Sequence, residues 1–321
     1  MDVNILSIEF ELGDKEFSSK SVADKFGRGE DYLQKVGTKK LYKLSNKSIE
    51  EVATIVSNKA IISAKIHKGD IKAIFATTCC NTCEFQMPGL ASIVGNKLGL
   101  EKIPMITLSM GCAGGVHALE SAFNFLIKRE KIDKEKGSVL IIAGDQFSRA
   151  AGDFSNTKAI FSDAISATII SNSKKGSYKL SNVRSSNLSG NLLSMKIQNP
   201  IANKKIEGVF LMEGKEVLKF ASEQVLPEAL RLAKISKMNS NLYIIPHQAS
   251  GIVVNSIKEK AGLTDEQFYS LGVGRYGNTT GASVFISLKD VIENNLADKR
   301  DILLIGFGAE LAVGIALLKK V

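Results

Sequence analysis

Cys112 stands where proteins often place a reactive thiol. The stretch TLSMGCAGGVHALESAFNFL (107–126) is typical of a strand end, a glycine-rich turn and a long helix, with the cysteine at the helix entrance. Unpaired amides and the positive end of the helix dipole at such an entrance lower the pKa of a thiol. The glycines allow a tight turn and a close approach by a substrate. Cys112 is therefore a candidate nucleophile, and the alternative is a small side chain buried in the core.

The chain has three histidines that could assist such a nucleophile. His247, in IIPHQAS (244–250), follows an apolar strand and a proline, so it lies at a strand end, where catalytic groups are often placed. A structural histidine is the alternative for this position. His67 lies at a lysine-rich helix end, which indicates the surface, and His117 is expected to pack within the helix after Cys112.

Asn278 occupies the position of Cys112 in an internal repeat. The stretch GRYGNTTGAS is again a glycine-rich turn that opens a helix, and Asn278 lies 166 residues after Cys112. Glu51 and Glu216, near the starts of two similar helices, are 165 residues apart. Five elements recur in one order at one spacing, which predicts a duplicated α/β unit of about 160 residues, too long for a solenoid repeat. The repeated elements are helices 48–61 and 214–226, strands 71–78 and 242–250, helices ending at 100 and 263, the two turns, and strands 138–145 and 301–308.

The apolar strands of the repeat do not alternate with polar residues. Such strands, separated by helices, predict mostly parallel sheets that are covered on both faces. Two units of this kind would pack pseudo-symmetrically, with a site at the strand ends near their junction. The duplication would bring together the two helix entrances, and with them Cys112, His247 and Asn278.

Composition excludes several classes of protein. The 321 residues are 44% hydrophobic, which is enough for a large core, and the net charge of +9 favours acidic partners. The lysines are scattered and lack interleaved aromatic residues, so nucleic acid is not an expected partner. The N-terminus is not typical of a signal peptide, and the longest apolar run (302–318) indicates two buried strands and a turn rather than a membrane span. Four cysteines without a secretory signal predict reduced thiols in the cytoplasm.

Two short motifs have weaker interpretations. GVGRYG (272–277) matches the glycine pattern of dinucleotide sites, but no strong strand precedes it, so NAD binding is not expected. CCNTC (79–83) contains a C-x-x-C pair without a second pair or a nearby histidine, so no metal site is expected, and cysteines of a pocket or core are the better interpretation.

The motifs GCAGGVHAL, IIPHQAS, RYGNTTGAS and GFGAELAVG, in this order and spacing, resemble the β-ketoacyl-acyl-carrier-protein synthase III family of the thiolase superfamily. The resemblance covers essentially the whole chain. It implies a thiolase-like fold of duplicated αβαβα layers with two pseudo-symmetric halves, residues 1–172 with the nucleophile and residues 173–321 with the histidine and the asparagine.

The resemblance implies a role for each candidate. Cys112 would accept an acyl group from a thioester, either acyl-CoA or an acyl-carrier-protein thioester. His247 and Asn278 would support decarboxylation of a malonyl thioester and stabilise its enolate, which would then attack the acyl group on Cys112. The backbone amides of Cys112 and Ala309 would form the oxyanion hole. Met87 lies where a family member closes the acyl pocket of its partner, which implies a homodimer. The substrates and an acyl carrier protein are the implied partners, without a further cofactor and without a membrane.

The sequence departs from the family at the edges of the site. The family usually has three glycines where this chain has Gly308, Ala309 and Glu310. Where the family often has an asparagine and an arginine that helps dock the carrier protein, this chain has Ser250 and Ile252.

The clamp that often holds the adenine of coenzyme A is also altered. The chain has no tryptophan, and Asp31 or Tyr32 falls near that position. In the shortened stretch 153–161, Ser155 or Asn156 falls where the arginine is expected. The interpretation is a specialised condensing enzyme, of a secondary-metabolite or unusual lipid pathway, with altered recognition of donor and carrier.

Three other functions stay open at this stage. An acyltransferase of the same fold would move the acyl group from Cys112 to a hydroxyl or amine, but such enzymes need a base and often change the position of Asn278. A non-catalytic partner subunit would typically lose the nucleophile. A nucleotide-binding regulator would depend on GVGRYG alone.

Overall fold

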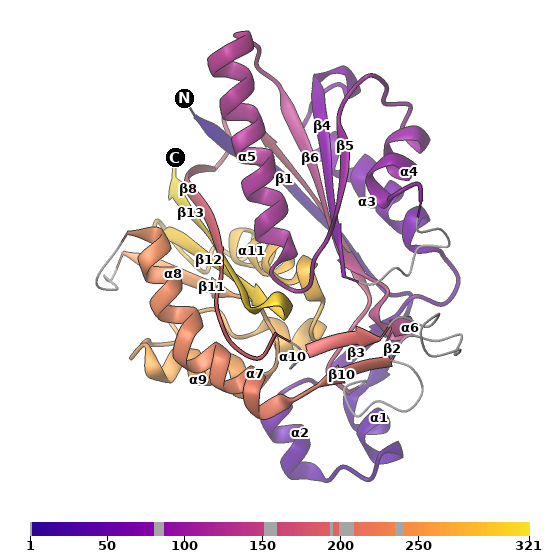
Figure 1. The fold of residues 1–321 in the computed structure, drawn as a ribbon, viewed down its shortest axis with the longest axis vertical. Helices are drawn as coiled ribbons and strands as arrows, with labels where there is room; N and C mark the ends of the chain where they lie inside the picture. Colours follow the sequence, from indigo (N-terminus) through magenta and orange to yellow (C-terminus); the bar gives the residue numbers. More distant parts are fainter. Residues whose placement is uncertain (1, 80–86, 151–158, 193–194, 199–208, 235–240) are drawn as a thin grey trace.

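Nine strands form one continuous sheet through the part of the chain that the structure describes (Figure 1). The structure is a computed structural model, and it describes residues 2–79, 87–150, 159–192, 195–198, 209–234 and 241–321. The sheet has the strand order β11 (Leu242–Pro246), β12 (Asp301–Gly308), β13 (Ala312–Lys320), β8 (Tyr178–Asn187), β1 (Val3–Leu12), β7 (Ala164–Ser171), β6 (Ser138–Asp145), β4 (Ile71–Thr78) and β5 (Met105–Ser109). Two small ladders join β2 (Lys15–Ser18) to β3 (Lys40–Lys43) and β9 (Met195–Gln198) to β10 (Val209–Met212).

The strand directions correct one prediction. Strand β4 is parallel to β5 and β6, and β11 is parallel to β12, but the ladders β1–β7, β1–β8, β6–β7, β12–β13 and β13–β8 are antiparallel. The expectation of mostly parallel sheets is therefore wrong. Between β12 and β13 the reason is chain length, because only Ala309–Leu311 connect them and a parallel crossover needs a dozen residues or more.

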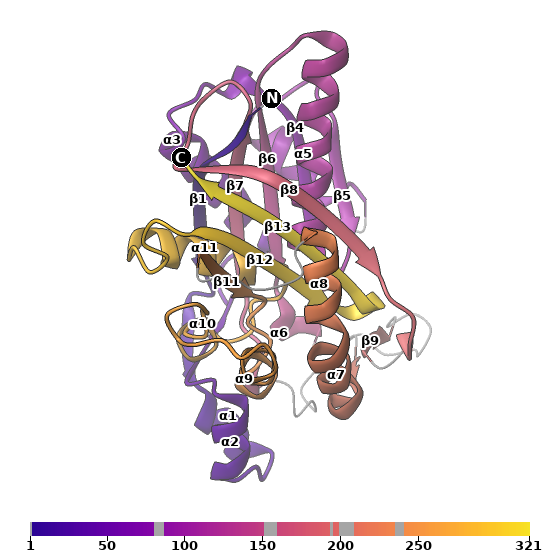
Figure 2. The same ribbon diagram turned by 90° about the vertical axis from the view of Figure 1, so that its left-hand side faces the viewer.

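Helices fill the space between and outside the two parts of the sheet (Figures 1 and 2). The longer helices are α3 (Ile49–Ser63), α4 (Leu90–Lys97), α5 (Gly114–Asp133), α8 (Leu226–Ala233), α9 (Gly251–Lys260) and α11 (Ser283–Glu293). The short helices are α1 (Ser19–Lys25), α2 (Glu30–Val36), α6 (Phe147–Ala150), α7 (Gly214–Phe220) and α10 (Gly272–Tyr276). The segment η4 (Ala221–Val225) is π-helical, and η1 (Lys68–Asp70), η5 (Thr280–Ala282) and η6 (Ala309–Leu311) are single 3₁₀ turns. In both views α1 and α2 project from one end of the molecule.

The buried residues separate the helices into layers. One core unites side chains of α5 and α11 with strands from both parts of the sheet, so these two helices lie between them. A second core joins α3 and α4 to the outer face of β4, β6 and β7, and a third joins η4, α8 and α9 to the outer face of β11, β12 and β13. The order helix, sheet, helix, sheet, helix is the αβαβα architecture that the resemblance implies, which confirms the predicted fold class.

The two parts of the sheet repeat one arrangement. In the first, β4 pairs in parallel with β6, α5 precedes β6, and β7 returns antiparallel. In the second, β11 pairs in parallel with β12, α11 precedes β12, and β13 returns antiparallel. The parts join where β1 pairs with β8, over only Val3–Ile5. The boundary of the halves at residue 172 stays a prediction.

The predicted elements differ from the observed ones mainly at their ends. Helix α3 begins as its sequence indicates, because Ser48 Oγ accepts a hydrogen bond from Glu51 N–H and Glu51 Oε2 accepts one from Ser48 N–H. The helix expected over 214–226 continues to Ala233 through α7, η4 and α8. Among the described residues, no helix is long and hydrophobic enough to cross a membrane.

Candidate active site

Cys112 lies in the turn between β5 and α5, and its side chain is buried. Helix α5 begins two residues later, at Gly114, so its first amides are close to the cysteine. The end of β12, from the other half, packs against the turn: a Cβ added to Gly308 would lie 2.8 Å from the Cβ of Cys112. A glycine permits this approach, and it places Cys112 at the contact between the two halves.

His247 follows the last residue of β11 and is only 1% exposed. Its N–H donates to the carbonyl of Ile305 at 2.7 Å, and its ring packs edge-on against Phe307, with centroids 5.3 Å apart. Ring atom Nδ1 lies 3.0 Å from Oγ of Ser283, the first residue of α11. Because Ser283 Oγ accepts from the N–H of Gln248, its own hydrogen can go to Nδ1. This arrangement allows the other ring nitrogen, Nε2, to carry a hydrogen and donate it.

Burial keeps His247 neutral. It lowers the pKa of the imidazole to about 3, from an ordinary value of 6.5, because the charged ring would lose its water. The unfolded chain takes up a proton near the ordinary value, whereas the folded protein does so only at much lower pH. The stability that neutral His247 contributes is therefore complete above pH 6.5 and is lost as the pH falls, by up to about 1.4 kcal/mol per pH unit.

We expect His247→Gln to weaken this pH dependence. Between pH 7 and pH 5 the free energy of unfolding, measured by urea denaturation, should fall more for the wild type than for the variant. The matched control is His67→Gln, because His67 is exposed. If His247→Gln and the wild type lost the same stability over this range, His247 would not be a buried neutral histidine.

Asn278 is 4% exposed, and its backbone and side chain are both fixed. Its N–H donates to the carbonyl of Ile160 and its carbonyl accepts from Ser162 N–H, each at 2.9 Å. The side-chain oxygen Oδ1 accepts from the N–H of Thr280, also at 2.9 Å. With Oδ1 held in this way, the amide nitrogen lies on the opposite side, where it can donate a hydrogen bond.

The turns that carry Cys112 and Asn278 meet. A Cβ added to Gly115 would lie 2.3 Å from the carbonyl oxygen of Gly281, and a Cβ added to Gly281 would lie 3.4 Å from the amide nitrogen of Gly115 and 3.8 Å from the carbonyl oxygen of Gly111. Helices α5 and α11 therefore begin side by side. The structure brings together the turns of Cys112 and Asn278 with each other, and joins Cys112 to the strand that His247 contacts.

Ala309 and Glu310 lie beside the cysteine's turn. A Cβ added to Gly111 would lie 3.6 Å from the amide nitrogen of Ala309 and 3.4 Å from Oε2 of Glu310. Glu310 adopts φ 64°, a left-handed conformation that favours glycine, and its Oε2 accepts from Gly111 N–H at 3.4 Å. Burial raises the pKa of Glu310, while the Gly111 hydrogen bond and nearby His117 act in the opposite direction.

Met87 lies outside this cluster. It is 86% exposed and precedes α4, so within a single chain it does not line the site around Cys112.

Tyr32, at the expected adenine position, is packed with Val36 and lies under the guanidinium of Arg28, 5.5 Å from the ring centre. Ser155 and Asn156 fall outside the described residues. Ser250 precedes α9 as its N-cap residue, and Ile252 is exposed on that helix.

The structure describes all of one weaker motif and part of the other. GVGRYG lies over α10, with no strand directly before it. In CCNTC, the Sγ of Cys79 lies 3.4 Å from Oδ2 of Asp145, whereas Cys80 and Cys83 fall outside the described residues. In the described ranges, no group of three or more His, Cys, Asp or Glu side chains is placed to hold a metal ion.

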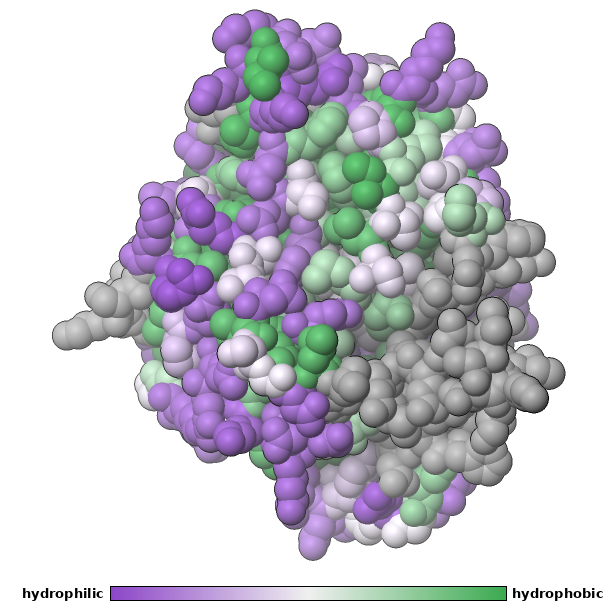
Figure 3. All heavy atoms as spheres, in the orientation of Figure 1, coloured by the Kyte–Doolittle hydropathy of each residue, from purple (hydrophilic) through white to green (hydrophobic). Residues whose placement is uncertain are grey.

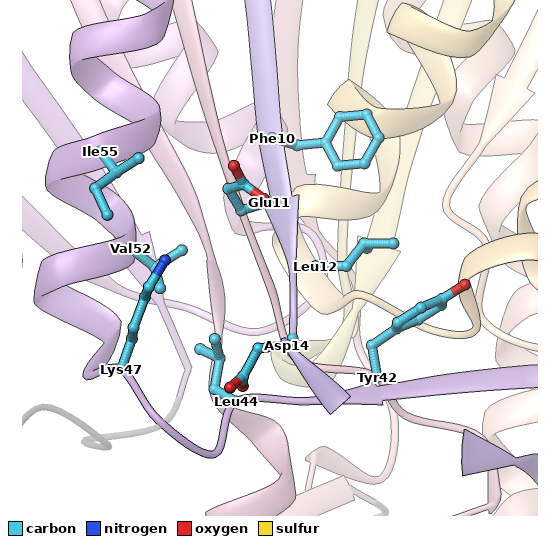
Figure 4. A pocket seen from close by; sticks show the side chains of 10 residues that line it. Phe10, Glu11, Leu12, Asp14, Tyr42, Leu44, Lys47, Val52 and Ile55 are labelled. Atoms are coloured by element: carbon cyan, nitrogen blue, oxygen red, sulfur yellow. The ribbon is translucent and has the colours of Figure 1, made fainter. Parts of the chain in front are cut away.

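Of two hollows among the described residues, only one adjoins the candidate site. A small one of about 10 Å³ adjoins the candidate site and is lined by Leu192, Val217, Phe220, Gly308, Ala309, Glu310 and Leu311. The larger one, of about 340 Å³, lies near the end of β1 and the start of α3, and Glu11, Val52 and Ile55 are among the residues that line it (Figure 4). None of the candidate catalytic residues lines the larger hollow.

Three buried residues that hold the candidates in place were not predicted. Ser283 contacts the ring of His247, Thr280 contacts Asn278, and Asp145 contacts Thr280. Ser283 and Thr280 both belong to the RYGNTTGAS motif, so that motif carried a signal for them. Asp145, at the end of the predicted strand 138–145, carried none.

The comparisons with known proteins agree with this geometry. The family model for 3-oxoacyl-[acyl-carrier-protein] synthase III matches residues 106–188, and the model for the C-terminal part of that family matches residues 235–320. A relative from Fusobacterium nucleatum, a β-ketoacyl-[acyl-carrier-protein] synthase III, is 34% identical over 286 residues, which cover 85% of this chain and 84% of the relative.

Solved structures show the same fold. The 3-oxoacyl-[acyl-carrier-protein] synthase III of Aquifex aeolicus superposes with a TM-score of 0.84 at 22% identity and 99% coverage of both chains. A priming β-ketosynthase from a polyketide biosynthetic pathway superposes with a TM-score of 0.86 at 22% identity, covering 99% of this chain and 96% of its own. The match over most of the chain, on a fold whose two helix entrances meet at a buried cysteine, makes this protein a member of the β-ketoacyl-[acyl-carrier-protein] synthase III family.

Proposed function

We propose that this protein is a condensing enzyme that accepts an acyl group on Cys112 and joins it to a malonyl thioester. The observation that carries the proposal is the contact between the turns of Cys112 and Asn278, at Gly115 and Gly281. It supports a site to which both halves contribute, as the resemblance implies. Family membership supports the same reaction.

The first step is the loading of Cys112. The cysteine sulfur attacks the carbonyl carbon of a thioester, the bond to the donor sulfur breaks, and the donor thiol leaves with a proton. The amides of Cys112 and Ala309 are proposed to hold the oxyanion of the intermediate. The position of Ala309 beside Gly111, with the amide nitrogen 3.6 Å from the added Cβ, supports that role.

The second step is the formation of a carbon–carbon bond. The malonyl thioester loses CO₂, and the resulting enolate oxygen accepts hydrogen bonds from His247 Nε2 and Asn278 Nδ2. The enolate carbon attacks the acyl carbonyl, the bond to the Cys112 sulfur breaks, and a β-ketoacyl thioester leaves. A neutral histidine and an amide suit this step, because both donate hydrogen bonds without needing a charge. Loss of CO₂ supplies the electron pair, so we propose that no cofactor takes part.

Intact-mass measurement tests the function. The protein is incubated with a panel of acyl-CoA and acyl-carrier-protein donors, and the added mass identifies the acyl group. A malonyl thioester is then added, and the product is measured. Release of the adduct as a β-ketoacyl thioester supports condensation, whereas release only by hydroxyl or amine acceptors would support the acyltransferase alternative.

The donor is proposed to be an acyl carrier protein rather than free coenzyme A. The net charge of +9 favours an acidic carrier. Lys215 and Lys219 are exposed on α7, the helix whose Val217 lines the small hollow beside Ala309. A carrier docked on α7 would therefore lie at the edge of the site.

We expect loading from the carrier to be faster than from the matching acyl-CoA and to slow as salt is added. Lys215→Glu combined with Lys219→Glu should reduce loading from the carrier by about tenfold or more and leave loading from acyl-CoA nearly unchanged. The matched control is Lys131→Glu, an exposed lysine at the far end of α5. Equal, salt-insensitive loading from both donors would contradict the carrier preference.

The assembly is proposed to be a homodimer that completes the acyl pocket with Met87 of the second copy. Strand β5 is an edge of the large sheet, and its Ile106 is 43% exposed. Hydrophobic residues, coloured green, gather beside β5 and α5 on the face shown in Figure 3. An exposed edge with apolar side chains favours pairing with another strand.

Light scattering should give twice the mass of the chain. Ile106→Lys should shift the protein toward the monomer, because it places a charge on the edge strand. Ile62→Lys is the matched control, since Ile62 is 66% exposed on α3, away from β5. A wild-type protein that stays monomeric at working concentration would overturn the dimer.

A further inference from the structure

Thr280 adopts a backbone conformation that its own side chain opposes. It has φ 51°, in the left-handed region, where a β-branched residue is a rare outlier. It is 1% exposed and lies directly between the turn of Asn278 and α11. A conformation of this kind persists only when the surroundings hold it, and it is most common at functional sites.

Two hydrogen bonds hold Thr280, one on each side. Its Oγ1 donates to Oδ2 of Asp145 at 2.5 Å, and its N–H donates to Oδ1 of Asn278 at 2.9 Å. In this left-handed conformation the N–H of Thr280 points toward the asparagine and its hydroxyl reaches the aspartate. Thr280 therefore links Asp145 to Asn278.

Asp145 anchors this link in the other half of the protein. It is the last residue of β6 and is 2% exposed. Its Oδ1 accepts from Thr78 Oγ1 at 2.5 Å and from the N–H of Cys79 at 2.8 Å, at the end of β4. The carboxylate thus belongs to β6 and is hydrogen-bonded to the end of β4, both in the first half. Through Thr280 it also contacts the second half.

The link decides which way the amide of Asn278 faces. With Oδ1 accepting from the N–H of Thr280, a 180° flip would bring the NH₂ group against another donor and lose the bond. The amide nitrogen is therefore kept on the opposite side, as a donor. A donor that stabilises a developing charge is effective only when it is held in place before the reaction.

We propose that Thr280 and Asp145 are positioning residues for Asn278, holding its amide nitrogen ready to donate to the enolate. The proposal rests on the proposed function in one respect, the identity of the group that accepts the hydrogen bond. The orientation of the amide is independent of it. The link also makes the second step depend on contact between the two halves, because the anchor and the asparagine belong to different halves.

Thr280→Val tests the link, because valine keeps the branched shape and removes the hydroxyl. Decarboxylation and condensation should fall on the order of 10–100-fold, less than on removal of the donor itself. Loading of Cys112 should stay within about twofold of the wild type. Thr280→Ser, which keeps the hydroxyl, should restore condensation to within about threefold.

The matched control is Thr168→Val. Thr168 is fully buried on β7, and its hydroxyl has no hydrogen-bond partner among the described residues. The same substitution there should leave loading and condensation unchanged. A fall in loading equal to the fall in condensation for Thr280→Val, or a failure of Thr280→Ser to restore condensation, would overturn the proposal.

A double-variant cycle shows whether Thr280 acts through Asn278. Thr280→Val should cost little in a protein that already carries Asn278→Ala, because no amide remains to be oriented. Losses that multiply in the double variant would overturn the proposal.

The same four proteins are also compared in urea denaturation, where the double variant should lose less stability than the two single variants together. This coupling does not depend on the reaction. A wild-type protein that fails to condense but shows the coupling would contradict the proposed function and leave the link standing, whereas absence of the coupling would overturn the link.

Discussion

Replacing Cys112 with alanine should abolish acyl loading. No donor of the panel should then add mass to the protein. The physical reason is that a methyl group cannot form a thioester. Decarboxylation of the malonyl thioester should continue at a measurable rate, because His247 and Asn278 remain in place. The measurements are intact mass after incubation with donor, and CO₂ release from the malonyl thioester alone.

Cys79→Ala is the control for this result. The thiol of Cys79 lies 3.4 Å from Oδ2 of Asp145, and the hydrogen bond from its backbone N–H to that carboxylate does not need the thiol. Asp145 is proposed to act on Asn278, and so on condensation rather than on acyl loading. The variant should therefore keep the acyl adduct of the wild type. If Cys112→Ala still delivered the acyl group to the product, the covalent mechanism would be wrong, and a persistent adduct would place the nucleophile at another residue.

The meeting of the two turns could be predicted from sequence because duplication restricts topology. Cys112 and Asn278 lie at equivalent points of two similar units, and equivalent strand ends meet when such units pack face to face. The glycines of the turns support the same conclusion, since Gly115 and Gly281 leave room for backbones in contact. The approach of Gly308 to Cys112 follows the same logic.

Strand direction and the residues that hold the candidates could not be predicted in this way. A buried strand has the same apolar residues whether its neighbour is parallel or antiparallel, so the residues of β7 carried no sign of its direction. For β13 the short connection Ala309–Leu311 did indicate an antiparallel pair with β12. Asp145 ends an apolar strand, and nothing in its local sequence indicates which hydroxyl it accepts from. The left-handed backbone of Thr280 opposes the preference of a β-branched residue, so tertiary contacts decide it.

The sequence identified Glu310 as an unusual residue beside the site but did not indicate what its carboxyl group contacts. Its place in a loop where the family usually has glycine marked it as unexpected. The structure adds that its carboxylate contacts the N–H of Gly111, directly before the nucleophile, and that its backbone keeps the left-handed conformation of a glycine. The departure therefore places a carboxyl group beside the site, on a backbone conformation that favours glycine.

Replacing Asn278 with aspartate should stop condensation while loading survives. Aspartate has nearly the same shape, and one of its oxygens can still accept from the N–H of Thr280 at the position of Oδ1. The other oxygen replaces the amide nitrogen, so a hydrogen-bond donor becomes a negative charge beside the developing enolate. Loss of one such donor reduces a rate by roughly 10²–10³-fold, and the repulsion adds to that loss. Condensation is measured as product formation by protein that already carries the acyl group.

Asn278→Ala separates the two contributions to this loss. Alanine removes the donor without adding a charge, so its condensation rate should lie between those of the wild type and Asn278→Asp. All three proteins should load Cys112 at similar rates, because the sulfur attacks the donor thioester before an enolate exists. Condensation near the wild-type rate in Asn278→Asp would show that the amide does not stabilise the enolate. An equal loss in both variants would show that the lost donor accounts for the whole effect and that the added charge contributes nothing further.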